Sequence, residues 1–216
     1  MHPSETGSLI FFGGTFDPVH SGHVDCVQRA RAFDPQATIW VAPAYSPVSL
    51  NDSDRDGLKK PSFSFEKRLQ LLKDVFAEEP SVYVSDLEKT LRAPNYTIQT
   101  IQEIYKQNPG KKISLLIGWD QWLSFPKWHR VSELLTIVDL LVVPREQEWG
   151  SKGAVFELEG GLQKLGASAK GAVIRLLAGN TTVISSQSIR NYINTKQEDS
   201  RILQGIPRVV KKGIGL

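Results

Sequence analysis

The sequence of 216 residues is long enough to bury a hydrophobic core, and its 40% hydrophobic and 23% charged residues are ordinary for a globular protein. A formal net charge of +3 suits a protein that handles small polyanions, but it is too slight to indicate a nucleic-acid partner. Cys26 is the only cysteine, and the sequence has no signal-peptide pattern and no apolar run near the ~18 residues of a membrane span. We therefore expect a cytoplasmic protein without a membrane partner. The composition leaves a homo-oligomer open.

Short apolar runs alternate with helical patterns along the chain. The apolar runs predict strands at 9–12, 38–42, 81–87, 113–117, 139–143, 172–177 and 182–184. Apolar residues at helical spacing predict helices at 23–33, 65–76, 96–108, 131–137 and 186–193. This alternation predicts an α/β protein with right-handed crossovers and a Rossmann-like, doubly wound parallel sheet, which binds ligands beyond the carboxyl ends of its strands.

Three longer segments complete the expected organisation of a single domain over 1–216. The polar stretch 45–64 is long for a connecting loop, which suggests a role in function. The stretch 148–171 is rich in Gly, Ser and Lys and is expected to be a variable insertion. The last part, about 186–216, is expected to be helical.

The first motif, GGTFDPVHSGH at 13–23, joins the first strand to the first helix. Gly13 and Gly14 let backbone amides approach an anion, and the helix that follows offers its positive N-terminal end. His20 and His23 lie three residues apart, so both imidazoles can face one ligand and donate hydrogen bonds to phosphate oxygens. A metal site is the alternative for such a pair, but no third ligand is evident nearby.

The second motif, ISSQSIR at 184–190, also runs from a strand into a helix. Ser186 is a natural N-cap, and hydroxyl groups with free amides at a helix start suit phosphate. Arg190, one turn further on, can bind phosphate oxygens with its forked guanidinium. Taken alone, the segment is also consistent with a capped helix that carries a solvated arginine.

The two motifs together resemble those of the HxGH nucleotidyltransferases, and the first is typical of bacterial nicotinate mononucleotide adenylyltransferases. NYTIQT at 95–100, GWD at 118–120 and WHR at 128–130 resemble further motifs of these enzymes. The resemblance covers nearly the whole chain and implies one nucleotidyltransferase domain. It also implies the activity: transfer of AMP from ATP, with Mg²⁺, to nicotinate mononucleotide, giving nicotinate adenine dinucleotide and pyrophosphate in NAD biosynthesis.

The resemblance assigns roles residue by residue, with no protein ligand for a metal. The implied catalytic residues are His20, His23 and Arg190. The implied ATP site adds Gly13, Gly14, Thr15, Phe16, Gly118, Asp120, Ser185, Ser186 and Ile189 to these three. The implied acceptor site comprises Lys59, Lys60, Tyr96, Thr97, Trp128, His129 and Arg130. Within these sites, Trp128 would stack on the pyridine ring, amides near Thr97 and His129 would hold the carboxylate, and Asp120 would bind ribose hydroxyls.

Two departures from the family pattern keep alternatives open. The family's usual Pro-Pro-His-Lys after the second strand is replaced by AYSPVS at 44–49, so we infer that Lys59 or Lys60 supplies the missing charge. That lysine pair resembles loops in enzymes that use phosphopantetheine or nicotinamide mononucleotide, and both remain alternative acceptors. Gln187 stands where the family carries Thr, and together with the missing His-Lys pair it leaves a nucleotide-binding module without catalysis as a third hypothesis.

Overall fold

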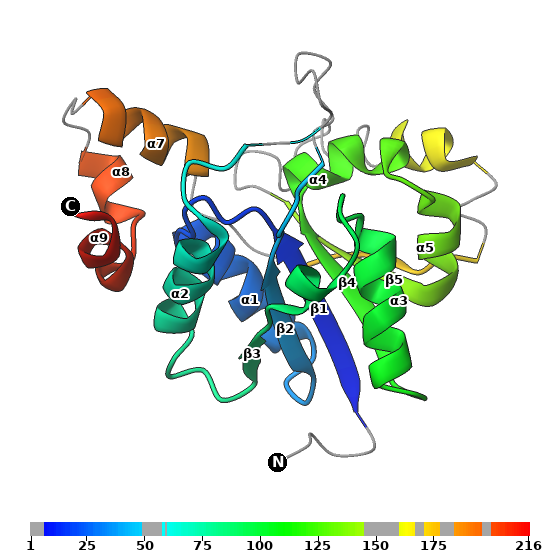
Figure 1. The fold of residues 1–216 in the computed structure, drawn as a ribbon. Coiled ribbons are helices and arrows are strands. Elements are labelled where there is room, and N and C mark those ends of the chain that lie inside the picture. Colours follow the sequence, from blue (N-terminus) through cyan, green and yellow to red (C-terminus); the bar gives the residue numbers. More distant parts are fainter. Residues whose placement is uncertain are drawn as a thin grey trace.

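The protein, for which we have a computed structural model, is built around one parallel sheet (Figure 1). The structure describes residues 7–48, 58, 60–144, 160–166, 171–177, 184–195 and 200–216. The six strands in these ranges are β1 (Ser8–Gly14), β2 (Thr38–Pro43), β3 (Val82–Val84), β4 (Lys112–Gly118), β5 (Val138–Val143) and β6 (Ile174–Leu176). Their order is β3-β2-β1-β4-β5-β6 and every neighbouring pair is parallel, which confirms the predicted Rossmann-like, doubly wound sheet.

Helices cover both faces of this sheet (Figure 1). The helices are α1 (Ser21–Phe33), α2 (Phe65–Val75), α3 (Thr97–Gln107), α4 (Trp119–Ser124), α5 (Val131–Ile137), α7 (Ser186–Thr195), α8 (Ser200–Gln204) and α9 (Arg208–Ile214), with short 3₁₀ turns η1 (Leu87–Thr90) and η2 (Phe125–Lys127). Helices α1, α2, α7 and α9 pack on one face, and α3, α4 and α5 pack on the other. The expected helical C-terminal part is therefore present as α7, α8 and α9.

The alternation of side chains along the strands divides the core into two layers. In β1, Ile10 and Phe12 face the layer of α1 and α2, whereas Leu9 and Phe11 face the layer of α3 and α5. All four are at most 5% exposed, so the strand is buried on both faces. This explains why the central strands read in the sequence as continuous apolar runs.

The structure differs from the expected elements at β3 and at α4, and two further expectations lie largely outside the described residues. The strand expected at 81–87 is shortened to β3 and followed by η1, because β3 lies at the edge of the sheet and has only one neighbouring strand. Helix α4 was not expected; it begins directly after β4 and buries Trp119 and Trp122. Of the strand expected at 182–184, only Ile184 is described, and it is not in a strand; most of the expected insertion at 148–171 also lies outside the described residues.

The carboxyl ends of the central strands lie at one edge of the sheet, where the chain order switches between β1 and β4. Gly14, Pro43, Gly118 and Val143 are the last residues of β1, β2, β4 and β5. The first motif, at 13–23, and the segment GWD at 118–120 begin at the ends of β1 and β4. No helix in the described ranges is both long enough and apolar enough to span a bilayer.

Candidate functional site: a cleft at the carboxyl edge of the sheet

A cleft of about 640 Å³ lies over these strand ends. It brings together segments that are far apart in the sequence: the ends of β1, β4 and β5, the first turns of α1, α3 and α4, and the segment before α7. The expected ATP-site residues that line it are Gly13, Gly14, Thr15, Phe16, His20, His23, Gly118, Asp120, Ser185 and Ser186. The expected acceptor-site residues that line it are Tyr96, Thr97, Trp128 and His129.

The turn from β1 into α1 is held in shape by the packing of Phe16. Phe16 has a φ of 49°, a left-handed conformation that is uncommon outside glycine, and its ring is buried edge-on against Phe12. A Cβ at Gly14 would lie 3.1 Å from the Phe16 ring, so glycine permits this close approach. The turn thereby exposes its backbone to the cleft.

The two histidines of the first motif lie against each other at the start of α1. Their ring centroids are 3.8 Å apart, and His23 Nδ1 accepts a hydrogen bond from the backbone N–H of His20 at 3.2 Å. An Nδ1 that accepts a hydrogen bond carries no proton, so the neutral His23 ring carries its proton on Nε2. Burial, and secondarily the neighbouring His20, lowers the pKa of His23 well below its ordinary value. His23 is therefore a neutral hydrogen-bond donor in the free protein.

The second motif reaches the same cleft from the C-terminal side of the chain. Ser185, rather than Ser186, caps α7: its Oγ accepts a hydrogen bond from the backbone N–H of Ser188 at 3.1 Å, which corrects the expected cap. Ser186 is the first helical residue, and its hydroxyl donates to the carbonyl oxygen of Pro18 at 2.9 Å. The start of α7 is thus hydrogen-bonded directly to the first motif.

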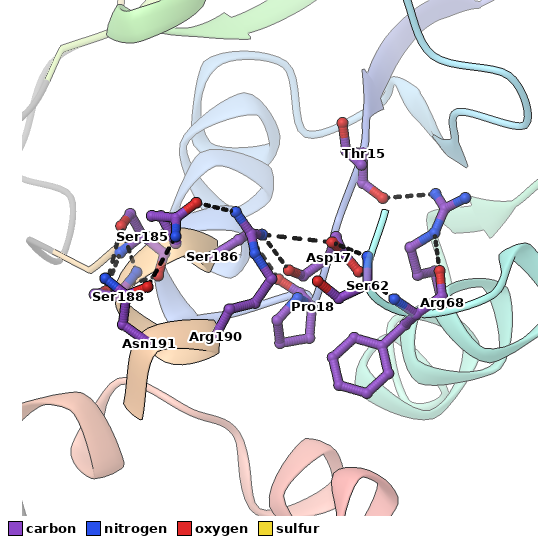
Figure 2. A network of polar contacts seen from close by, with 12 residues as sticks. Thr15, Asp17, Pro18, Ser62, Arg68, Ser185, Ser186, Ser188, Arg190 and Asn191 are labelled. Atoms are coloured by element: carbon purple, nitrogen blue, oxygen red, sulfur yellow. Dashed lines mark hydrogen bonds and ion pairs between the residues drawn. The ribbon is translucent and has the colours of Figure 1, made fainter. Parts of the chain in front are cut away.

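Arg190 makes a second connection between the two motifs (Figure 2). Its Nη1 donates to the carbonyl oxygen of Asp17 at 2.6 Å and lies 3.5 Å from Asp17 Oδ2, while its Nη2 donates to Gln187. The Arg190 side chain is 16% exposed and is not among the residues that line the cleft. It therefore lies outside the cleft and contacts the backbone of the turn between β1 and α1.

Asp17 also holds the segment that precedes α2 (Figure 2). Its two carboxylate oxygens accept hydrogen bonds from the backbone N–H groups of Ser62 and Phe63, both at 2.8 Å. Arg68, which is 1% exposed, donates to the carbonyl oxygens of Thr15 and Phe63 at 2.7 and 3.1 Å. The first motif, the segment before α2 and the start of α7 thus form one network, which the sequence analysis did not foresee.

The opposite end of the cleft carries aromatic rings. Tyr96 and His129 are stacked with ring centroids 4.2 Å apart, and Trp128 directly precedes His129 in the chain. The centroid of the Trp128 ring is 5.2 Å from that of the fully buried Phe125 ring, and this contact holds Trp128 against the core. Thr97 begins α3 at this end of the cleft. The arrangement offers a flat aromatic surface beside a helix start.

Glu88 and Asn95 support this end of the cleft and were missed by the sequence analysis. Glu88 accepts hydrogen bonds from the Thr100 hydroxyl at 3.0 Å and from the Tyr45 backbone N–H at 3.2 Å. Burial raises the pKa of Glu88, although these two hydrogen bonds oppose the rise. Asn95 accepts from the backbone N–H of Ser46 at 2.8 Å and donates to the carbonyl oxygen of Glu88. No local sequence pattern signals these contacts, because two of them join residues more than 40 positions apart.

Several expected site residues do not line the cleft. Ile189 is fully buried in the core, and Arg130 forms an ion pair with Glu133 on α5. Lys60 is exposed and is not among the lining residues, whereas Lys59 lies outside the described residues. Trp119 and Trp122 pack in the core and are 1% and 0% exposed.

Comparison with known proteins agrees with this geometry. Residues 11–192 match the model of the cytidylyltransferase-like family, and the chain belongs to that family. A solved structure of a Plasmodium falciparum nicotinic acid mononucleotide adenylyltransferase complexed with NaAD has the same fold, with a TM-score of 0.71 at 15% identity over 97% of this chain and 95% of that one.

Curated relatives point to one branch of the family. A probable nicotinate-nucleotide adenylyltransferase of Legionella pneumophila is 31% identical over 65% of this chain, and the chain covers 63% of that relative's length. A protein of the same name from Thermosipho melanesiensis is 29% identical over 85% of this chain and 86% of its own length. The chain thus spans less than two thirds of the Legionella relative but most of the Thermosipho relative.

Proposed function

We propose that this protein transfers the adenylyl group of ATP to nicotinate mononucleotide, releasing pyrophosphate and forming nicotinate adenine dinucleotide. The observation that carries the proposal is the single cleft in which a histidine pair and the α7 cap lie at one end and stacked aromatic rings at the other. The names of the curated relatives support the same substrate.

The end of the cleft formed by the turn from β1 into α1 and by the start of α7 suits the triphosphate of ATP. His23 offers Nε2–H as a neutral donor, and the starts of α1 and α7 add backbone N–H groups and the positive ends of two helix dipoles. Arg190 contributes positive charge from outside the lining and, through its contacts with Asp17, positions the turn. Asp120, exposed at the start of α4, remains the candidate for the ribose hydroxyls.

The aromatic end of the cleft suits the acceptor. Trp128, or the Tyr96–His129 stack, offers a flat surface for the electron-poor pyridine ring. Thr97, at the start of α3, provides backbone N–H groups for the nicotinate carboxylate. The proposal that Lys59 or Lys60 meets the acceptor phosphate has no support from the cleft lining, since Lys60 does not contribute to it.

The reaction needs alignment and charge stabilisation more than a covalent intermediate. An oxygen of the acceptor phosphate attacks the α-phosphorus of ATP; the new P–O bond forms as the bond to the bridging oxygen breaks, and pyrophosphate leaves with the electron pair. Among the described residues, no three His, Cys, Asp or Glu side chains cluster as a metal cage. This suits Mg²⁺, which is commonly bound through substrate phosphates and would supply charge neutralisation there.

The test is pyrophosphate release with ATP and each of three acceptors: nicotinate mononucleotide, nicotinamide mononucleotide and phosphopantetheine. We expect the highest kcat/KM with the first. His23→Ala should keep the fold and lose about 100-fold in rate, the usual cost of removing one transition-state hydrogen-bond donor. Lys106→Ala, on the outer side of α3 with a 73% exposed side chain, is the matched control and should retain full activity. Unchanged turnover in His23→Ala would reject the role of His23.

The alternative acceptors keep the same chemistry, and the rates on the three acceptors decide among them. Highest kcat/KM with nicotinamide mononucleotide or phosphopantetheine would replace the proposed acceptor. ATP binding without pyrophosphate release on any acceptor would favour the nucleotide-binding module. Gln187 bonds Arg190 and Asn191, so the replacement of Thr at this position does not remove polar contacts from α7.

A further inference from the structure

The cleft presents few positively charged side chains for a site that is proposed to hold anions. Among the described residues that line it, Lys127 is the only lysine or arginine, and the carboxylates are Glu88 and Asp120. Arg190 and Lys60 lie outside the lining, so Lys127 is the one permanent positive charge that the described part of the chain presents to the cleft. The sequence analysis did not assign it a role.

The backbone of Lys127 is fixed although its side chain is exposed. Lys127 ends η2, in which Phe125 is fully buried and accepts a hydrogen bond from the backbone N–H of Trp128 at 3.0 Å. The lysine therefore leaves the backbone at a defined point next to Trp128, at the aromatic end of the cleft. A fixed backbone limits the volume that the ammonium group samples and keeps it close to any ligand bound at Trp128.

Two acidic side chains near this end of the cleft, Glu88 and Glu133, already have partners. Both Glu88 oxygens accept hydrogen bonds, from Thr100 and from the Tyr45 backbone. Glu133 is paired with Arg130 and also accepts a hydrogen bond from Gln102. Lys127 itself forms no ion pair or hydrogen bond within the residues that the structure describes. Its charge is thus available to a ligand.

We propose that Lys127 is a specificity-determining residue, whose ammonium group pairs with the carboxylate on the pyridine ring of the acceptor and so favours nicotinate over nicotinamide mononucleotide. This inference rests on the proposed function. The two acceptors have nearly the same shape, and backbone N–H groups at a helix start can bind the oxygen of either a carboxylate or a carboxamide. A cation separates them, because its attraction to the charged group exceeds its attraction to the neutral one.

The test compares kcat/KM for the two acceptors in Lys127→Gln, Lys127→Arg and the control Lys106→Gln. In Lys127→Gln we expect kcat/KM for nicotinate mononucleotide to fall by about tenfold or more, mainly through KM, in line with the loss of one partly solvated charge-assisted contact. The value for nicotinamide mononucleotide should stay constant. Lys127→Arg should retain most of the preference, and Lys106→Gln should behave as the parent protein. Added salt should reduce the preference of the parent and leave that of Lys127→Gln unchanged.

Two results would overturn the assignment. An equal loss on both acceptors would show that Lys127 serves a group common to both, such as the phosphate, and no loss on either would show that it serves neither. Calorimetric titration with each acceptor provides the same comparison without turnover. If the parent protein neither binds nor adenylylates either pyridine nucleotide, the proposed function itself fails; if it uses nicotinate mononucleotide and Lys127→Gln keeps its selectivity, only the role of Lys127 fails.

Discussion

Asp17 is expected to contribute strongly to the stability of the folded protein, although its neighbours in the sequence do not signal this. Its carboxylate, 2% exposed, accepts two 2.8 Å hydrogen bonds from Ser62 and Phe63 and lies 3.5 Å from Arg190. A hydrogen bond to a charged group contributes about 1.5–3 kcal/mol to the free energy of unfolding. We take the lower value for each of the two bonds, because both are only partly buried. Asp17→Ala should therefore lower the free energy of unfolding by about 3 kcal/mol.

Urea denaturation followed by circular dichroism measures this loss. Asp17→Asn keeps an acceptor oxygen but not the charge, so it should lose about half as much as Asp17→Ala. Asp74→Ala removes an exposed carboxylate whose recorded contact is a hydrogen bond from Gln70, and it should stay within about 0.5 kcal/mol of the parent. A loss below about 1 kcal/mol in Asp17→Ala would refute the reasoning, because the two amides would then be equally well satisfied by water.

Two further predictions follow from groups in the cleft. The pKa of His23 is lowered in the folded protein, so below the ordinary pKa of about 6.5 the unfolded chain binds more protons than the folded one. The free energy of unfolding should therefore fall as the pH drops below that value, by at most about 1.4 kcal/mol per pH unit from His23. Urea denaturation at several pH values should show a smaller dependence of this free energy on pH in His23→Gln. Burial raises the pKa of Cys26 to about 12, so the folded protein should react with iodoacetamide at pH 8 far more slowly than the urea-unfolded protein. Mass spectrometry measures the alkylated fraction over time. Equal rates in the two states would contradict the burial of this thiol.

The turn from β1 into α1 and the start of α7 could be predicted from the sequence because their signals are local. Gly13-Gly14 after an apolar run, and Ser185-Ser186 before a helical pattern, identify the turns that line the cleft. Even here the cap was misplaced by one residue, since two adjacent serines are equally good caps and the choice depends on which backbone N–H each oxygen meets.

The supporting contacts could not be predicted, because they join residues that are distant in the sequence. Asp17 meets Ser62, Phe63 and Arg190 across 45, 46 and 173 positions. Arg190 was expected to bind phosphate, and no signal in the sequence indicated that its guanidinium also bonds the Asp17 carbonyl oxygen. Only the folded chain shows that Asp17 and Arg190, which do not line the cleft, connect segments that surround it.

Helix α4 and Lys127 were missed for a different reason. Their segment, 119–127, carries three aromatic residues and one proline, so its pattern does not separate a short helix from a loop. A signal for Lys127 was nevertheless present, because a lysine directly precedes the tryptophan that had been assigned to the acceptor ring. In such segments a charged residue next to a proposed stacking residue is itself a candidate for ligand binding.

The most direct test of the central claim is to incubate the protein with Mg²⁺, nicotinate mononucleotide and ATP labelled at the α-phosphorus, and to identify the labelled product by mass spectrometry. We predict that the label appears in nicotinate adenine dinucleotide in a one-to-one ratio with released pyrophosphate, and that His23→Ala makes little of it. If the label stays in ATP, or leaves it as AMP without joining the acceptor, the claim that one cleft aligns both phosphates for transfer is contradicted.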